Sequence, residues 1–278
     1  MDFVAPTGAT LVRTLGAGST FRLALVRRGD QELLCKRLRV RMLVEPKAQS
    51  MLRREAQALA LLQLDSTADL LGQGEDDQGP YVIETRLPGV TLREMVAGYR
   101  ERRSVVPPNV VRLVMERSFL ALAELHDAHG DEGRLELSHG DLAPDHVLVG
   151  ADGRVSFVDF GQARWRGMVE AAEEGELGSL PYVAPELARG EHQADQSCDV
   201  FALAGSIAYL ALGREPCRGT TPAARLVEAS ERGLDVAALS ARADLDGTVT
   251  DALMAALRFD RAARLRQAAD VLRRLRRG

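Results

Sequence analysis

Two acidic motifs joined by a hairpin pattern constrain this chain more than any other feature of its sequence. The first motif is HGDLAPDH at residues 139–146, and the second is DFG at residues 159–161. Residues 147–158 read as strand, Asp-Gly turn, strand, which predicts a β-hairpin. The folded hairpin brings the end of the first motif near Asp159, with Asp141 a few residues beyond. Unpaired charge beside an apolar hairpin is costly. We therefore expect the two carboxylates to serve a metal-assisted phosphoryl transfer, one as proton acceptor and one as Mg²⁺ ligand.

The hydrophobic pattern divides the chain into a β-rich first third and a mostly helical remainder. Alternation and turn residues predict three strands within residues 9–40 and a buried strand at 81–83, with residues 72–79 as a loop. Helices are expected at 47–64, after a Thr91–Glu94 capping box, at 111–126 and at 200–212.

These elements predict an α+β fold with two lobes. A small β-rich N-lobe with one main helix is expected over residues 1–84. Residues 85–90 would connect it to a larger, mostly helical C-lobe at 91–278.

Two charged side chains fall on faces that are otherwise apolar. Lys36 shares a strand face with Leu34, because side chains on a strand alternate with period two. Glu55 lies on a helical stripe with Leu52 and Leu59. Two charges of opposite sign can satisfy each other, so we predict a Lys36–Glu55 ion pair between strand and helix. Such a pair adds little net stability, which points to a functional reason for it. The alternative is that either side chain snorkels to solvent.

Composition limits the classes of function. The net charge of −4 gives no reason to expect nucleic acid as the main partner. No stretch approaches a membrane span of about 18 apolar residues, and no secretory signal is expected. The three cysteines are widely spaced and form no zinc or redox motif, so we expect a cytoplasmic protein.

Taken together, the motifs resemble those of the protein kinase family, and the resemblance covers almost the whole chain. The residues that carry it are Gly16-Ala17-Gly18, Lys36, Glu55, Asp141, Asp159-Phe160-Gly161, Ala184-Pro185-Glu186, Asp199 and Arg264. Their order and spacing fit the family throughout. The resemblance implies a two-lobed kinase fold, ATP with Mg²⁺ or Mn²⁺ as cofactors, and phosphoryl transfer to a Ser or Thr hydroxyl of a protein substrate.

The resemblance also assigns roles to single residues. Asp141 would accept the proton of the substrate hydroxyl, Lys36 would bind phosphate, and Glu55 would hold the lysine. Asp159 would bind the metal, with His146 as a second candidate ligand. Ile83 would be the gatekeeper, and the Glu84 carbonyl and Arg86 amide would contact adenine. The implied nucleotide-binding set is Gly16, Gly18, Leu23, Leu34, Lys36, Ile83, Glu84 and Arg86.

Four positions depart from the family pattern. Phe21 replaces the third glycine of the nucleotide loop, and Leu34 replaces the alanine over adenine. Ala143 replaces the lysine of the catalytic loop, and His146 replaces the asparagine that holds a second metal. Imidazole suits Zn²⁺ or Mn²⁺ better than Mg²⁺. We favour a hydrogen bond from His146 to Asp141 over metal binding.

Three functions therefore compete. The first is an active Ser/Thr protein kinase, which Ser179 after Gly178 and the retained charged residues favour. The second is a pseudokinase acting as a nucleotide-binding or protein-interaction module, which the four departures favour. The third is a small-molecule phosphotransferase of the aminoglycoside-kinase type, because those enzymes share the His-Gly-Asp sequence. The Ala-Pro-Glu segment indicates a protein substrate instead.

The segment before Ala-Pro-Glu is acidic, which bears on regulation. Gly140 stands where many family members carry an arginine that clamps a phosphorylated activation segment. Without that arginine, an added phosphate would meet repulsion from the acidic residues Glu170, Glu173, Glu174 and Glu176. We predict that phosphorylation of this segment does not activate the protein.

Overall fold

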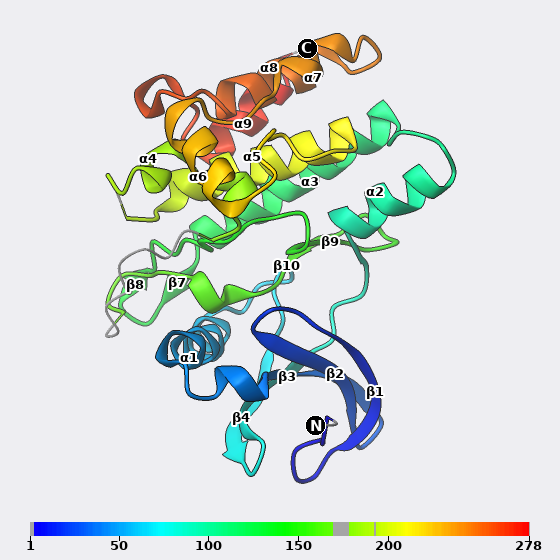
Figure 1. Ribbon diagram of the computed structural model, residues 1–278, viewed down its shortest axis with the longest axis vertical. Coiled ribbons are helices and arrows are strands. Elements are labelled where there is room, and N and C mark those ends of the chain that lie inside the picture. The colour runs from blue at the N-terminus through cyan, green and yellow to red at the C-terminus, as the bar shows by residue number, and fades with distance from the viewer. Residues whose placement is uncertain (1–2, 169–177, 192, 278) are drawn as a thin grey trace. The chain divides into compact units, whose positions relative to one another are not determined.

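The computed structural model describes residues 3–168, 178–191 and 193–277. The chain forms two compact units. Unit 1 comprises Met1–Leu87 and Asp159–Ala163, and unit 2 comprises Pro88–Val158 and Arg164–Gly278. Unit 1 is built on a β-sheet, whereas unit 2 is mostly helical (Figure 1). The predicted α+β class, with a β-rich first part and a helical remainder, is confirmed.

A five-stranded antiparallel sheet in the order β1-β2-β3-β5-β4 forms the centre of unit 1. One face of the sheet buries Phe3, Cys35 and Ile83 in a hydrophobic cluster. The other face buries Leu38 and Val82 against helix α1. The elements of unit 1 are β1 (Thr10–Ala17), β2 (Phe21–Arg28), β3 (Gln31–Leu38), η1 (Val40–Met42), α1 (Pro46–Leu61), β4 (Leu70–Asp76), β5 (Gly79–Thr85) and η2 (Phe160–Gln162).

Strand β4 corrects one prediction. Residues 72–79 were expected to form a loop, but β4 continues to Asp76 and pairs with β5. Its glycines and acidic residues lack the apolar alternation of a typical strand. The strand lies at the edge of the sheet, where polar and charged side chains are common because they discourage pairing with other chains.

Helix α1 presents one apolar stripe to the sheet. Pro46 stands at its first turn, where a missing N–H costs no hydrogen bond. Leu52, Ala56 and Leu59 are buried at helical spacing, as predicted, and Glu55 is buried on the same side of the helix. The strand and helix positions predicted for Lys36 and Glu55 are therefore correct.

Helix α5 is the most deeply buried helix among the described residues of unit 2, and it packs against α2, α3, α7 and α8 (Figure 1). It begins after Asp195, whose carboxylate accepts hydrogen bonds from the amides of Ser197 and Cys198. It ends at Gly213, which adopts a left-handed conformation (φ 66°). The apolar helix predicted at 200–212 is thus confirmed with a start four residues earlier.

The hairpin between the two acidic motifs is also confirmed. Strand β9 pairs antiparallel with β10, and Val147 lies opposite Phe157. The Thr91–Glu94 capping box opens α2 as predicted. The elements of unit 2 are β6 (Val90–Thr91), α2 (Leu92–Glu101), α3 (Pro108–His126), β7 (His129–Gly130), β8 (Gly133–Arg134), β9 (Val147–Val149), β10 (Val155–Phe157), η3 (Leu180–Tyr182), α4 (Pro185–Ala188), α5 (Gln196–Leu212), α6 (Pro222–Glu231), α7 (Ala237–Ala241), α8 (Gly247–Ala256), η4 (Arg261–Ala263) and α9 (Ala268–Leu275).

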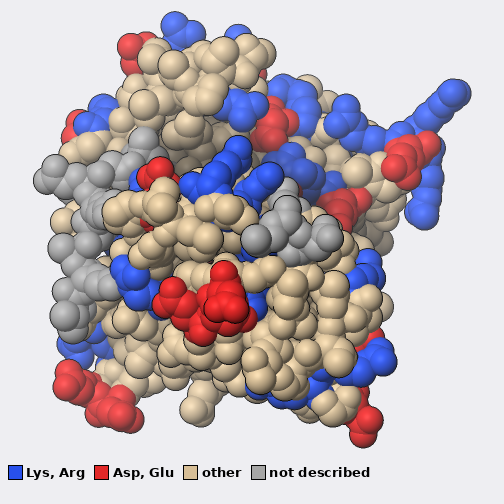
Figure 2. Space-filling view, turned by 60° about the horizontal axis from the view of Figure 1, so that its bottom comes forward, with Lys and Arg blue, Asp and Glu red and all other residues tan. Residues whose placement is uncertain are grey.

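The surface carries charges of both signs, and the described helices lack what a membrane span requires. Lys and Arg side chains are interspersed with Asp and Glu side chains on the face shown in Figure 2, as expected for a chain of net charge −4. Within the described ranges, none of the helices combines the length and the apolar character needed to cross a membrane.

Candidate functional site

The amine of Lys36 is the centre of a charged cluster in unit 1. It lies 2.6 Å from Oε2 of Glu55 and donates a hydrogen bond to Oδ1 of Asp159 at 2.9 Å. Lys36 is only 4% exposed and Glu55 only 1%. The predicted strand-to-helix ion pair is confirmed. Burial lowers the pKa of Lys36, but the attraction of Asp159 and Glu55 outweighs it and holds that pKa above its ordinary value. The amine is therefore charged at neutral pH.

Phe21 approaches the same amine from β2. The Lys36 amine lies 4.2 Å from the centre of the Phe21 ring, which is a cation–π contact. The ring is buried in the cluster between the sheet and α1. The resemblance implies a glycine at this position, so Phe21 places an aromatic ring beside the amine expected to bind phosphate. Sequence reasoning identified the missing glycine but not the contact that replaces it.

The turn between β1 and β2 leaves its backbone accessible. A Cβ atom added at Gly16 or Gly18 would meet no heavy atom within 4 Å. Gly16 has a φ of 143°, a conformation that favours glycine. The carbonyl of Gly18 accepts a hydrogen bond of 2.8 Å from Arg39, which ties the turn to the end of β3. The two glycines thus have the open backbone expected of a turn that approaches a ligand.

Asp159 is held against helix α1 in an unusual backbone conformation. It has a φ of 69° and a ψ of 70°, the left-handed region that few non-glycine residues adopt. Two residues on, the Gly161 carbonyl accepts a hydrogen bond of 3.2 Å from the buried Arg54 of α1. A Cβ atom at Gly161 would lie 3.3 Å from the Met51 carbonyl oxygen. Helix α1, which carries Glu55, therefore also positions Asp159. Such backbone outliers cluster at functional sites.

The pairing of β3 with β5 shows on which face of the sheet Ile83 lies. Ile83 lies opposite Cys35 and is buried with it on the face of the sheet away from α1. Glu84 lies opposite Leu34, so its side chain shares the face of Lys36. Glu84, and not Ile83, thus shares the face of Lys36. The sequence signal was a lone charge at the end of the apolar run Val82-Ile83.

The other predicted nucleotide-binding residues lie where β2, β3 and β5 meet. Leu23 is the cross-strand partner of Lys36, and Leu34 is that of Glu84. Both leucines are half-buried on the Lys36 face. Arg86 follows β5, and its side chain forms an exposed ion pair of 3.3 Å with Glu32. The structure therefore gathers Leu23, Leu34, Lys36 and Glu84 on one face.

In unit 2, Asp199 fixes the motif at residues 139–146. Its buried carboxylate accepts hydrogen bonds from the amides of His139 at 2.8 Å and Gly140 at 2.9 Å. The same carboxylate lies 2.9 Å from Nε2 of His126, at the end of α3. The first turn of α5 therefore positions the two residues that precede Asp141.

His146 makes the predicted hydrogen bond to Asp141, but to its backbone. Nδ1 of His146 lies 2.7 Å from the Asp141 carbonyl oxygen and 3.5 Å from the Oδ2 carboxylate oxygen. A carbonyl can only accept, so Nδ1 carries a proton. Histidines that bind metals commonly donate their other N–H in this way. The geometry is thus compatible with both roles considered for His146.

The segment before Ala184-Pro185-Glu186 reaches the carboxylate of Asp141. The amide of Ser179 donates to Oδ1 of Asp141 at 2.6 Å. Gly178 has a φ of 65°, and a Cβ atom there would lie 2.8 Å from the Gly140 carbonyl oxygen. Only glycine allows this approach. The contact orients the carboxylate expected to accept the substrate proton.

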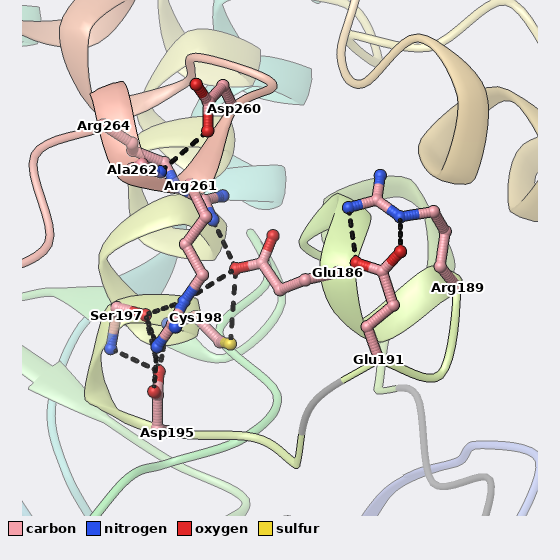
Figure 3. A network of polar contacts seen from close by, with 10 residues as sticks. All are labelled: Glu186, Arg189, Glu191, Asp195, Ser197, Cys198, Asp260, Arg261, Ala262 and Arg264. Atoms are coloured by element: carbon pink, nitrogen blue, oxygen red, sulfur yellow. Dashed lines mark hydrogen bonds and ion pairs between the residues drawn. The ribbon is translucent and has the colours of Figure 1, made fainter.

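Arg264 forms the pair with Glu186 that the resemblance implied, and Figure 3 shows the surrounding network. The side chains of Arg264 and Glu186 are 0% and 1% exposed. The guanidinium of Arg264 also lies 4.8 Å from the centre of the Phe201 ring. Nearby, Arg261 forms an ion pair of 2.5 Å with Asp195, which precedes α5. These contacts fix the end of the segment to the helical core.

A second network in unit 2 was not anticipated from the sequence. Nε of Arg93 donates to both carboxylate oxygens of Asp145, at 2.8 and 2.7 Å, and Nη1 donates to Glu215 at 3.0 Å. The hydroxyl of Tyr182 donates to the other oxygen of Glu215. Burial, followed by this bond, holds the pKa of Tyr182 well above its ordinary value. The network links the motif at 139–146 to the segment before α4.

The donor set fits a hard divalent cation at Asp159. Mg²⁺ is usually bound by one or two carboxylates together with phosphate and water oxygens. Over residues 3–168, 178–191 and 193–277, no three His, Cys, Asp or Glu side chains gather as a metal cage. A single carboxylate such as Asp159 suits a cation brought with a substrate. Asp159 belongs to unit 1 and His146 to unit 2, and each is a ligand candidate within its own unit.

The acidic residues used to predict the mode of regulation, Glu170, Glu173, Glu174 and Glu176, lie outside the described residues. That prediction stays untested.

Comparison with known proteins gives consistent matches. A protein kinase domain model matches residues 9–272. The chain is 29% identical over 205 residues to the serine/threonine-protein kinase PknL of Mycobacterium bovis, covering 73% of this chain and 48% of PknL. It is 26% identical over 212 residues to the serine/threonine-protein kinase PrkC of Bacillus subtilis, covering 75% of this chain and 31% of PrkC.

The chain thus spans about half or less of the length of the curated relatives it matches. The family model, in contrast, spans the two units, including the strand lysine and both acidic motifs. On that match, the chain belongs to the protein kinase domain family.

Proposed function

We propose that this chain transfers the terminal phosphoryl group of ATP to a Ser or Thr hydroxyl of a protein. The observation that carries the proposal is the Lys36 amine held between Glu55 at 2.6 Å and Asp159 at 2.9 Å. A buried ion pair contributes little to stability, so a pair joined by a third charged group is best explained by binding of a charged ligand. The named Ser/Thr kinase relatives support the choice of acceptor.

Each charged residue then has a distinct task. Lys36 supplies a fixed positive charge for phosphate oxygens, and Glu55 holds the amine in place. Asp159 is the ligand for a divalent cation, Mg²⁺ or Mn²⁺, which when bound supplies positive charge to the phosphates. Phosphoryl transfer depends mainly on such positioning and electrostatic stabilisation.

Asp141 is the proposed proton acceptor. The amide of Ser179 donates to its carboxylate, and Asp199 holds the backbone of the preceding His139. Together these contacts orient the carboxylate. A carboxylate oriented in this way can align a substrate hydroxyl and accept its proton as the new O–P bond forms.

Incubation of the purified chain with γ-labelled ATP, Mg²⁺ or Mn²⁺ and a generic acceptor such as casein tests the proposal. We expect label on Ser or Thr residues of the acceptor. Asp141→Asn should abolish labelling and leave the ATP-induced rise in melting temperature unchanged. The control is Asp145→Asn, a change of the same kind in the same motif, which should keep measurable transfer. Label that persists in Asp141→Asn would contradict the role of Asp141.

A second candidate, a nucleotide-binding pseudokinase, is favoured by the surroundings of Lys36. The amine already contacts two carboxylates and the Phe21 ring. A phosphate that binds Lys36 must displace at least one of these groups. In unit 2, the small Ala143 is buried where family members carry a lysine. This candidate predicts an ATP-induced melting shift without any label transfer.

The variant Phe21→Gly separates the two candidates further. It restores the family's glycine and removes the ring from Lys36. If the ring limits phosphate binding, the variant binds ATP more tightly than the parent protein does. An unchanged affinity would show that Phe21 does not obstruct the site.

A further inference from the structure

Glu84 is a buried carboxyl group on the binding face of the unit 1 sheet. It is 4% exposed and is the direct cross-strand partner of Leu34. Cross-strand partners of an antiparallel pair have Cβ atoms about 5 Å apart. Leu34 is the residue that the family resemblance places over the nucleobase. Glu84 therefore stands beside the base position and not beside the phosphates.

Two carboxyl groups contact the Lys36 amine, and a third lies on the same face of the sheet. Lys36 comes from β3, Glu55 from α1 and Asp159 from the segment before η2, and Glu84 adds a third acid from β5. Glu55 and Asp159 both contact the amine. Within the ranges that the structure describes, the Glu84 side chain makes no hydrogen bond or ion pair. A buried acid without a counter-charge is most stable in its neutral form.

The electrostatics agree with this geometry. Burial, followed by repulsion from Glu55, raises the pKa of Glu84 to about 8 despite the opposing attraction of Lys36. A neutral carboxylic acid has one O–H donor and one carbonyl acceptor side by side. Glutamine presents the same pattern of one donor and one acceptor, and it recognises adenine through the N6 amino group and the N7 atom.

We propose that Glu84 is a specificity-determining residue that hydrogen-bonds the edge of the nucleobase and selects 6-amino over 6-oxo purine nucleotides. The acid carbonyl accepts from the 6-amino group, and the acid O–H donates to a ring nitrogen. A 6-oxo purine presents two acceptors, O6 and N7, along the same edge. It leaves the acid carbonyl without a donor. This inference rests on the proposed binding of a nucleotide at unit 1.

Calorimetric titration with Mg·ATP and Mg·ITP tests the inference without relying on turnover. The protein carries Asp141→Asn in all samples to prevent phosphoryl transfer. We expect ATP to bind about tenfold more tightly than ITP at pH 7. Glu84→Gln should keep this ratio, and Glu84→Leu should bring it close to one. The matched control Ile83→Val, on the opposite face of the same strand, should keep the ratio.

The dependence on pH gives an independent readout. ATP affinity should fall as the pH rises through about 8, because ionised Glu84 loses its donor and repels the other carboxylates. Glu84→Gln should remove this fall, whereas Ile83→Val should keep it.

Two outcomes would overturn the inference and leave nucleotide binding in place. The first is an unchanged ATP:ITP ratio in Glu84→Leu. The second is equally tighter binding of both nucleotides, which would make Glu84 a competitor for Lys36. Failure of the parent protein to bind any nucleotide would overturn the proposed function as well.

Discussion

The buried pair of Glu186 and Arg264 allows a prediction whose size follows from its geometry (Figure 3). Both side chains are fully buried, but they are joined through only one oxygen and one nitrogen. Among the described residues, Oε2 of Glu186 and Nε and Nη1 of Arg264 find no hydrogen-bond partner. Removal of the Glu186 carboxylate leaves the Arg264 guanidinium as an unpaired buried charge. We expect Glu186→Gln to destabilise unit 2 by about 3–5 kcal/mol.

The pair as a whole should contribute far less. Desolvation of two ions is costly, and a single contact offsets only part of that cost. The double variant Glu186→Leu/Arg264→Met should therefore be much more stable than Glu186→Gln, apart from the loss of the Arg264–Phe201 contact. The exposed pair of Arg274 and Asp251 is a matched control. This pair is joined by two hydrogen bonds, of 2.7 and 2.9 Å, where the buried pair has one. Its side chains are nevertheless 37% and 58% exposed. Asp251→Asn should cost less than about 1 kcal/mol.

The assay uses the single tryptophan of the chain, Trp165, which belongs to unit 2. Thermal unfolding followed by Trp165 fluorescence should show Glu186→Gln melting about 6–20 °C below the parent protein. Asp251→Asn should melt within about 4 °C of the parent. Equal shifts for Glu186→Gln and Asp251→Asn would refute the reasoning, because burial would then not decide the cost. A double variant as unstable as Glu186→Gln would show that the intact ion pair contributes several kcal/mol to the stability of unit 2, contrary to the expectation.

Three further outcomes are expected. Gly178→Ala should lower phosphoryl transfer strongly, because the added Cβ would lie 2.8 Å from the Gly140 carbonyl oxygen. The control Gly190→Ala has a similar φ of 69°, but its added Cβ would meet no heavy atom within 4 Å, so it should only lower the melting temperature. Asp76→Asn should destabilise unit 1 by about 1.5–3 kcal/mol at pH 7, since Arg37 loses its carboxylate. The hydrogen bond from Arg37 lowers the pKa of Asp76 below that of a free aspartate. The difference in unfolding free energy between the parent protein and Asp76→Asn, measured by urea titration, should therefore vanish as the pH falls through this lowered pKa. Glu84→Gln should stabilise unit 1 increasingly from about pH 4.5 to 8 and level off above, because the folded pKa of about 8 exceeds the unfolded value; a constant difference across this range would contradict that assignment.

The ion pair of Lys36 and Glu55 could be predicted from the sequence because each residue breaks an apolar pattern with its own period. A charge on the buried face of a strand or helix needs a partner, and the chain offered one of opposite sign. The hairpin at 147–158 was predictable for a similar reason, because its turn residues and apolar runs are local. Neither prediction required knowledge of how strands distant in the sequence pair.

The face on which Ile83 lies could not be predicted from the sequence because strand register is not local. A shift of one residue moves every side chain to the other face of the sheet. The run Val82-Ile83-Glu84 contains no alternation that fixes which residue shares the face of Lys36. The pairing of Cys35 with Ile83 decides it. The role of Phe21 was hidden for the same reason, since its ring reaches Lys36 only once β2 and β3 are aligned.

The charged residues around Lys36 and the Phe21 ring form one electrostatic arrangement in unit 1. Lys36 contributes one positive charge, and Glu55 and Asp159 contribute two negative charges, so the group as a whole is anionic even with Glu84 neutral. On the proposed function, we expect such a group to repel a bare triphosphate unless a cation bound at Asp159 supplies positive charge. The Phe21 ring adds a cation–π contact to the amine at 4.2 Å. Replacing Phe21 by a smaller residue would admit water to the cluster. Water would weaken the attraction of Lys36 to Glu55 and Asp159. We therefore expect the binding of a phosphate ligand at the Lys36 amine to depend on a cation at Asp159.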